Sequence, residues 1–237
     1  MYNDKARNLL VRKKIIDAAE GRLIGVIEEF SKSFDILEKH EKTVSIFGSA
    51  RVLPETLIYK SAYNIAKALA NQGYAIVTGG GGGVMEAANK GAYDIVKPSI
   101  GFNIELPTEQ HLNSYTTEHY SFEHFFGRKV ALTLNANAYV YLPGGFGTMD
   151  EMFEILTLIQ TQIVPIVPFI LYDSNFWQPI LEFNNNILAK KYRTVDPLDL
   201  DIIKICNTVD EVVDYIKSRK DDALKLPSTS GFSELVN

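Results

Sequence analysis

The sequence predicts an α/β fold built on a doubly wound parallel sheet. Short, nearly continuous apolar runs alternate with longer segments of helical periodicity between residues 43 and 218. Strands that are apolar along their whole length are typical of parallel sheets buried on both faces. Two of these runs also lead directly into glycine-rich turns that open helical patterns. We therefore expect a Rossmann-like domain with helices on both faces and an extra N-terminal helix or helices.

The elements follow one another in a regular order along the chain. Residues 4–40 place apolar side chains at helical spacing among many charges, which predicts one or two amphipathic helices. The expected strands are 43–47, 74–78, 99–104, 138–142, 168–172 and 202–206. The expected helices are 55–71, 84–92, one from about residue 125 after a polar loop, 148–160, 175–188 and 209–218. The predicted organisation is an N-terminal helical segment (1–40) packed on one Rossmann-like domain (41–220), followed by a flexible tail (221–237).

The composition narrows the classes of function. The 237 residues carry a formal net charge of −5, whereas proteins that bind nucleic acid or anionic membranes usually present a basic face. The single cysteine, Cys206, leaves no internal disulfide and no zinc-cysteine cluster. Charges are mixed through the first 20 residues, and no apolar run approaches the length of a bilayer span. We expect a cytoplasmic protein that binds neither nucleic acid nor membrane.

The segment 143–151, with sequence PGGFGTMDE, joins an apolar run to a helical pattern. Its glycines and its hydroxyl-bearing residue are Gly144, Gly145, Gly147 and Thr148. Glycines expose backbone N–H groups, and the start of a helix adds the positive end of its dipole, so this turn suits an anion such as phosphate. Glu151 follows about one turn inside the helix, where a carboxylate could act on a bound molecule. The alternative is a tightly packed strand-to-helix turn in which Glu151 is an ordinary first-turn acid.

A second glycine loop lies at 78–86, with sequence TGGGGGVME, again between an apolar run and a helical pattern. Five consecutive glycines are costly to order, so a ligand or another backbone is expected to approach closely. The candidate ligand-binding residues here are Gly80, Gly81, Gly83, Met85 and Glu86.

The first expected strand ends in FGSAR at 47–51, which places Gly48, Ser49 and Arg51 at the edge of the sheet where ligands bind. We count all three as candidate contacts, although Arg51 could equally be a solvated surface charge. The segment lacks the G-x-G-x-x-G fingerprint, and neither glycine loop is followed by Lys-Ser or Lys-Thr. A dinucleotide cofactor and a Walker-type ATP site are therefore not expected.

Four blocks occur in order: FGSAR at 47–51, TGGGGGVMEAAN at 78–89, Arg128-Lys129, and PGGFGTMDE at 143–151. Together they resemble the lonely-guy family of nucleoside 5'-monophosphate phosphoribohydrolases, formerly called lysine decarboxylase-like proteins, over roughly residues 44–216. Glu86 and the Ala-Ala-Asn after it resemble the bacterial branch, since the plant enzymes tend to have glycine at that place.

The resemblance implies a function for the domain at 41–220, which would bind a nucleotide and hydrolyse its N-glycosidic bond. The products would be a free base and ribose 5-phosphate, with AMP or a cytokinin riboside monophosphate as substrate. The resemblance also implies that Arg128 and Glu151 are the catalytic residues. It further implies a homodimer or higher homo-oligomer, and the many apolar faces of segment 4–40 point the same way.

The residue types fit this chemistry. Cleavage of a ribosyl-base bond builds positive charge on the ribose, so Glu151 could stabilise that charge or deprotonate water. Arg128 could grip a phosphate or a hydroxyl, with Lys129 as a second cation. The alternative for this pair is a charge cluster at the start of a helix.

Two rival functions remain open at this point. A lysine decarboxylase would need pyridoxal phosphate on a lysine, and no lysine of the chain has a recognisable cofactor-binding context. The other rival is a noncatalytic nucleotide or molybdenum-cofactor binding protein on the same fold. His111, His119 and His124 show no metal-binding spacing, so we expect neither a metal nor a cofactor.

Overall fold

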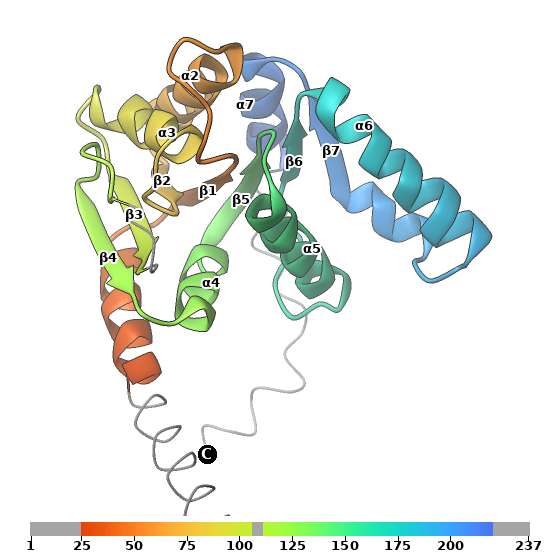
Figure 1. Ribbon diagram of the computed structural model, residues 1–237, viewed down its shortest axis with the longest axis horizontal. Coiled ribbons are helices and arrows are strands. Elements are labelled where there is room, and N and C mark those ends of the chain that lie inside the picture. Colours follow the sequence, from red (N-terminus) through yellow and green to blue (C-terminus); the bar gives the residue numbers. More distant parts are fainter. Residues whose placement is uncertain (1–24, 106–110, 220–237) are drawn as a thin grey trace, which may run out of the picture.

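The computed structural model describes residues 25–105 and 111–219 (Figure 1). The first part of the predicted N-terminal segment and the predicted tail at 221–237 lie outside the described residues. Within the described ranges, no helix is both long enough and apolar enough to cross a membrane.

A seven-stranded parallel sheet forms the centre of the protein, in the order β4-β3-β2-β1-β5-β6-β7. The strands are β1 (Thr43–Phe47), β2 (Ala75–Thr78), β3 (Ser99–Ile104), β4 (Glu118–Phe122), β5 (Ala136–Tyr141), β6 (Phe169–Tyr172) and β7 (Ile203–Cys206). The chain builds outward from β1 in one direction through β2 to β4, and then returns to the other side of β1 through β5. The neighbouring carboxyl ends of β1 and β5 are therefore the point where the strand order reverses, which is the usual ligand site of such sheets.

Helices cover both faces of the sheet (Figure 1). They are α2 (Leu57–Asn71), α3 (Val84–Tyr93), α4 (Phe125–Thr133), α5 (Phe146–Gln160), α6 (Ser174–Phe183), α7 (Val209–Ser218), and a helix described over residues 25–37. One apolar core joins α2, α3 and α7 to one face of the sheet, and a second core joins α4, α5 and the helix at 25–37 to the other. Because successive strand side chains point to opposite faces, Ile46 belongs to the first core and Phe47 to the second. The predicted α/β fold with a doubly wound parallel sheet is confirmed.

Two elements differ from the sequence prediction. The segment expected as a polar loop before α4 contains the edge strand β4, whose sequence EHYSF keeps several polar side chains partly or fully exposed. An edge strand buries less surface than a central one, so its apolar signal is weak. The helix expected to end at 188 is regular only as far as Phe183, and it continues as a π-helix over Asn184–Lys191.

Candidate active site

A cavity of about 930 Å³ opens at the carboxyl ends of β1 and β5. The loops that leave these strands are joined by a backbone hydrogen bond of 3.1 Å from Ser49 N to Pro143 O. The lining includes these residues predicted from the sequence: Gly48, Ser49, Arg51, Met85, Arg128, Gly144, Gly145, Gly147, Thr148 and Glu151. All four sequence blocks therefore contribute to a single cavity, and the block at 78–89 does so through Gly79 and Met85.

The start of α5 forms one wall of this cavity. The helix begins at Phe146, two residues earlier than predicted, and its N-cap is Gly145, which has no side chain to accept hydrogen bonds from the first turn. A Cβ added to Gly145 or Gly147 would meet no atom within 4 Å, so both glycines border open space. Gly144 is different, because a Cβ there would lie 2.1 Å from Thr148 Oγ1. The turn thus presents unobstructed backbone and a positive dipole end to the cavity, which is the geometry of an anion site.

Glu151 reaches the same cavity from the second turn of α5. Only 6% of the residue is exposed, and its Oε2 atom is buried with no hydrogen-bond partner. Burial raises the pKa of its carboxyl group to about 7, although the positive charges of Lys129 and Arg128 oppose this rise. A carboxyl group with an unpaired oxygen that titrates near neutral pH can exchange protons with a reacting molecule.

Arg128 enters the cavity from α4. Its Nε donates a hydrogen bond of 2.8 Å to the carbonyl oxygen of Phe102 on β3. One terminal nitrogen passes so close to Gly79 that a Cβ on that glycine would lie 2.1 Å away. Burial lowers the pKa of the guanidinium, and the negative charge of Glu151 opposes that shift. Because the backbone fixes one side of the guanidinium, its remaining donors are available to a ligand in a set direction.

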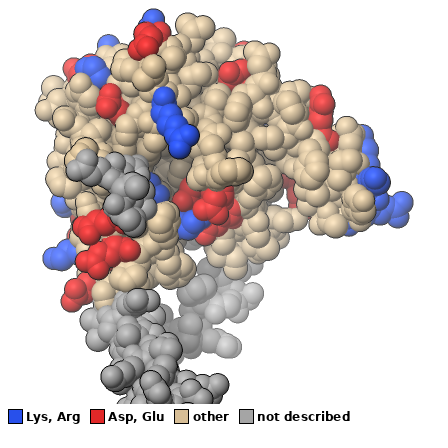
Figure 2. Space-filling view, viewed as in Figure 1, with Lys and Arg blue, Asp and Glu red and all other residues tan. Residues whose placement is uncertain are grey.

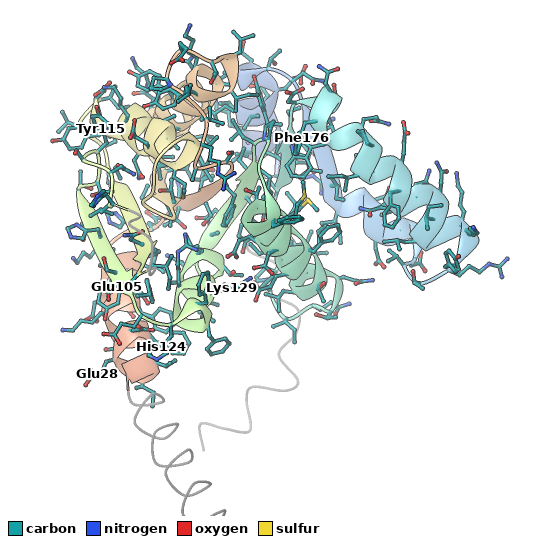
Figure 3. All side chains as sticks on the ribbon, viewed as in Figure 1. Glu28, Glu105, Tyr115, His124, Lys129 and Phe176 are labelled. Atoms are coloured by element: carbon teal, nitrogen blue, oxygen red, sulfur yellow. The ribbon has the colours of Figure 1, made fainter. Side chains whose placement is uncertain are left out.

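Lys129 is not part of the cavity lining, and its predicted contact with substrate stays a prediction. It lies between α4 and α5 (Figure 3), with its Nζ paired to Asp150 at 2.7 Å, to Glu154, and at 3.7 Å to Glu151. Figure 2 shows acidic and basic groups in contact on this part of the surface. Burial lowers the pKa of the Lys129 amine, but its hydrogen bonds to Asp150 and Glu154 reverse this effect and raise it overall. In the structure, Lys129 connects the helix of Arg128 to the helix of Glu151.

The first glycine loop contributes Gly79 and Met85 to the cavity lining. Gly80, Gly81, Gly83 and Glu86 are not part of the cavity lining. Asn113 donates hydrogen bonds to the carbonyl oxygens of Gly80, at 2.8 Å from its backbone N, and Gly81, at 3.0 Å from its side chain. Glu86 accepts a hydrogen bond of 2.8 Å from the Tyr59 hydroxyl. Close approach of other protein atoms accounts for the lack of a side chain at Gly80, where a Cβ would lie 2.9 Å from Leu112, and at Gly83, where it would lie 2.3 Å from the carbonyl oxygen of Ser49. Ligand binding by this loop stays a prediction.

Several lining residues were not singled out from the sequence. They include Gly79, Ile104, Phe125, Leu132, Phe146 and Phe176. Phe176 comes from the first turn of α6, beyond the end of β6 (Figure 3), and Phe125 from the first turn of α4. Apolar side chains are common throughout the chain, so only their position in the fold marks them as parts of the site.

Comparison with known proteins agrees with this arrangement. A family model described as "Possible lysine decarboxylase" matches residues 85–216, more than half of the chain. The chain belongs to this family. It is also 25% identical over 182 residues to a probable cytokinin riboside 5'-monophosphate phosphoribohydrolase of Oryza sativa subsp. japonica, covering 76% of this chain and 85% of the relative. A cytokinin riboside 5'-monophosphate phosphoribohydrolase of Rhodococcoides fascians is 24% identical, and the alignment covers 75% of this chain and 90% of the relative. The predicted lonely-guy family is confirmed, and the assignment to its bacterial branch stays a prediction.

Solved structures of two molybdenum-cofactor proteins show the same architecture. The molybdenum cofactor carrier protein of Chlamydomonas reinhardtii aligns with a TM-score of 0.58 at 19% identity, over 77% of this chain and 99% of that chain. The molybdenum cofactor binding protein of Rippkaea orientalis aligns with a TM-score of 0.56 at 22% identity, over 76% of this chain and 97% of that chain. At these identities the likeness establishes the fold and not the ligand.

Proposed function

We propose that this protein hydrolyses the N-glycosidic bond of nucleoside 5'-monophosphates, with AMP or a cytokinin riboside 5'-monophosphate as substrate. The observation that carries the proposal is Glu151, a buried carboxyl group with an unpaired oxygen in the cavity that the open turn of α5 borders. A protein that only held an anion would gain nothing from a second negative charge beside it. The names of two relatives that align along most of their length support the same reaction.

The proposed reaction adds water across the bond between ribose C1' and the base nitrogen. The phosphate binds the first-turn N–H groups of α5 near Gly145 and Gly147, and Arg128 holds the nucleotide from the opposite side. As the bond to the base breaks, C1' becomes electron-poor and the Glu151 carboxylate stabilises it or takes a proton from the attacking water. The base leaves with one proton, and the hydroxyl group remains on C1' of ribose 5-phosphate. Both roles of Glu151 require its negative charge.

The rival proposal is a noncatalytic nucleotide or molybdenum-cofactor carrier, which the likeness to two molybdenum-cofactor proteins favours. A panel of AMP, GMP, CMP, UMP and isopentenyladenosine monophosphate separates the two functions when each is incubated with the protein and analysed for free base. Release of base from at least one nucleotide, lost in Glu151→Gln, is the expected result. Binding of the same nucleotides without release of any base would favour the carrier.

We also propose that the protein works as a homo-oligomer, at least a dimer, with α4 and α5 at the interface. Large apolar side chains are strongly exposed on both helices: Phe125 (55%), Phe126 (63%), Phe146 (96%) and Phe153 (41%). Apolar groups gathered on one part of a surface mark contact sites. Light scattering at micromolar concentration is expected to give a mass of at least twice 26.6 kDa. The substitution Phe153→Glu should lower that mass. A mass near 26.6 kDa with full activity would contradict an oligomer that borders the site.

A further inference from the structure

Helix α4, which carries Arg128, begins without a capping side chain of its own. Its N-cap residue, His124, makes no side-chain cap hydrogen bond. The N–H groups at the start of a helix have no partner within the helix, and when they are buried they need an acceptor from elsewhere.

Glu29, on the helix at 25–37, instead accepts hydrogen bonds from the two backbone N–H groups that lead into α4. Its Oε1 atom receives hydrogen bonds from the backbone N of Glu123 at 2.7 Å and of His124 at 3.2 Å. The same oxygen lies 3.2 Å from Nδ1 of His124. These partners lie 94 and 95 residues away along the chain. The contact therefore ties a segment that precedes the sheet to the helix that carries Arg128.

The surroundings of Glu29 are shaped to accept a carboxylate. Glu29 is only 5% exposed, and its Oε2 atom has no hydrogen-bond partner, so burying this group is costly unless positive charge lies close by. The positive dipole end of α4 provides that charge. Gly127 leaves the necessary room, because a Cβ there would lie 2.7 Å from Glu29 Oε2. Phe30, the next residue after Glu29, packs edge-to-face on Phe126 at 5.7 Å between ring centroids.

His124 links Glu29 to Arg128, because its N–H group donates to Glu29 and its carbonyl oxygen accepts from Arg128. The backbone N of Arg128 donates to the carbonyl oxygen of His124 at 3.4 Å, in the first turn that Glu29 holds. The Arg128 side chain then fits a narrow path between Phe102 O and Gly79. A small movement of the first turn of α4 would therefore displace the guanidinium from this path.

We propose that Glu29 is a positioning residue for Arg128, which makes the N-terminal helix a working part of the site. Glu29 acts through α4 and touches no substrate. It lies outside residues 85–216, the range of the family model. The expected effect of Glu29 on turnover rests on the proposed function. The expected effect of Glu29 on the Arg128 side chain does not.

The test compares Glu29→Ala, Glu29→Gln and the matched control Glu28→Ala. Glu28 is the neighbouring carboxylate on the same helix (Figure 3), and it is exposed. The first readout is exchange of the Arg128 Nε–H with solvent by nitrogen-15 NMR, with the resonance assigned by its loss in Arg128→Lys. The second readout is kcat/KM for release of base from AMP, measured alongside thermal unfolding.

We expect Glu29→Ala to speed Nε–H exchange and to lower kcat/KM on the order of 10- to 100-fold, as misplacement of a binding group does. Glu29→Gln keeps an acceptor but loses the charge, so it should fall between Glu29→Ala and the wild type in both readouts. Glu28→Ala should match the wild type.

A folded Glu29→Ala protein with wild-type Nε–H exchange would overturn the proposal, even if its unfolding temperature fell. If Glu29→Ala does not fold, wild-type exchange and kcat/KM in Glu29→Gln would overturn it instead. If the wild-type protein releases no base from any nucleotide, the proposed function fails, and Nε–H exchange alone still decides the role of Glu29.

Discussion

The two glycine loops look alike in sequence but do different work in the structure. Each follows a strand of the same sheet and opens a helix, β2 into α3 and β5 into α5. In the first loop, a Cβ at Gly83 would lie 2.3 Å from the carbonyl oxygen of Ser49, and a Cβ at Gly80 would lie 2.9 Å from Leu112. In the second loop, a Cβ at Gly145 or Gly147 would touch nothing within 4 Å. Protein atoms occupy the space beside Gly80 and Gly83 of the first loop, whereas Gly145 and Gly147 of the second loop border the cavity.

The glutamates that follow the two loops differ in the same way. Glu86 is partly exposed and accepts a hydrogen bond from Tyr59, whereas Glu151 is buried with one unpaired oxygen. A satisfied carboxylate beside packed glycines is part of the framework, and an unsatisfied one beside open glycines indicates a reacting group. The number of glycines does not distinguish a loop packed within the protein from a loop that borders the cavity. The free space around each glycine does distinguish them.

The largest effect on stability is expected at the first loop. Gly83 has φ of +64°, and its missing side chain makes room for Ser49 O, so Gly83→Ala should lower the free energy of unfolding by about 3 kcal/mol. Gly73→Ala is the matched control, because Gly73 has φ of +89° with nothing within 4 Å, and strain alone should cost about 1 kcal/mol. Urea unfolding measures both. Equal losses in the two variants would contradict the close approach at Gly83.

The pH dependence of activity should separate the two glutamates. Because burial raises the pKa of Glu151 to about 7, the carboxyl group is protonated and uncharged below that pH. We therefore expect kcat/KM to fall about tenfold per pH unit below the midpoint and to level off above it.

Glu86→Gln should leave this midpoint in place, and Glu151→Gln should abolish it. The substrate phosphate, which also titrates near neutral pH, is common to all three proteins and so cancels from the comparison. If the midpoint moved in Glu86→Gln, the titrating group would belong to the first loop and would not be Glu151.

A smaller effect is expected at the open glycines. Gly147→Ala places a methyl group where we propose that phosphate binds, so KM for AMP should rise about fivefold, close to 1 kcal/mol. Stability should not fall, since Gly147 lies in the first turn of α5 and alanine favours helix. Steady-state kinetics and urea unfolding of the same sample give both results. An unchanged KM would contradict binding of phosphate at the second loop.

Strands and loops that a local sequence pattern encodes could be predicted. Features that depend on contacts between residues far apart in the sequence could not. The central strands are largely apolar and could be predicted within about two residues, whereas β4, a half-exposed edge strand, could not. The loop at 143–151 lines the cavity with its own glycines, so its place there could be predicted from the local pattern. The packing of the fivefold glycine run could not be predicted, because Asn113, which donates a hydrogen bond to Gly81, and Ser49, which lies against Gly83, are distant from it in sequence. The role of Glu29 depends on partners 94 and 95 residues away, which no local pattern reveals.

Base release from AMP and from adenosine, by the wild-type protein and by Glu151→Gln, decides whether the anion turn of α5 and Glu151 form the active site. We predict that the wild-type protein cleaves AMP far better than adenosine, because only AMP can use the anion turn of α5. We also predict that Glu151→Gln binds AMP nearly as well but loses turnover on the order of 100-fold or more. Equal cleavage of AMP and adenosine, or turnover by Glu151→Gln within a few-fold of the wild type, would rule out these roles.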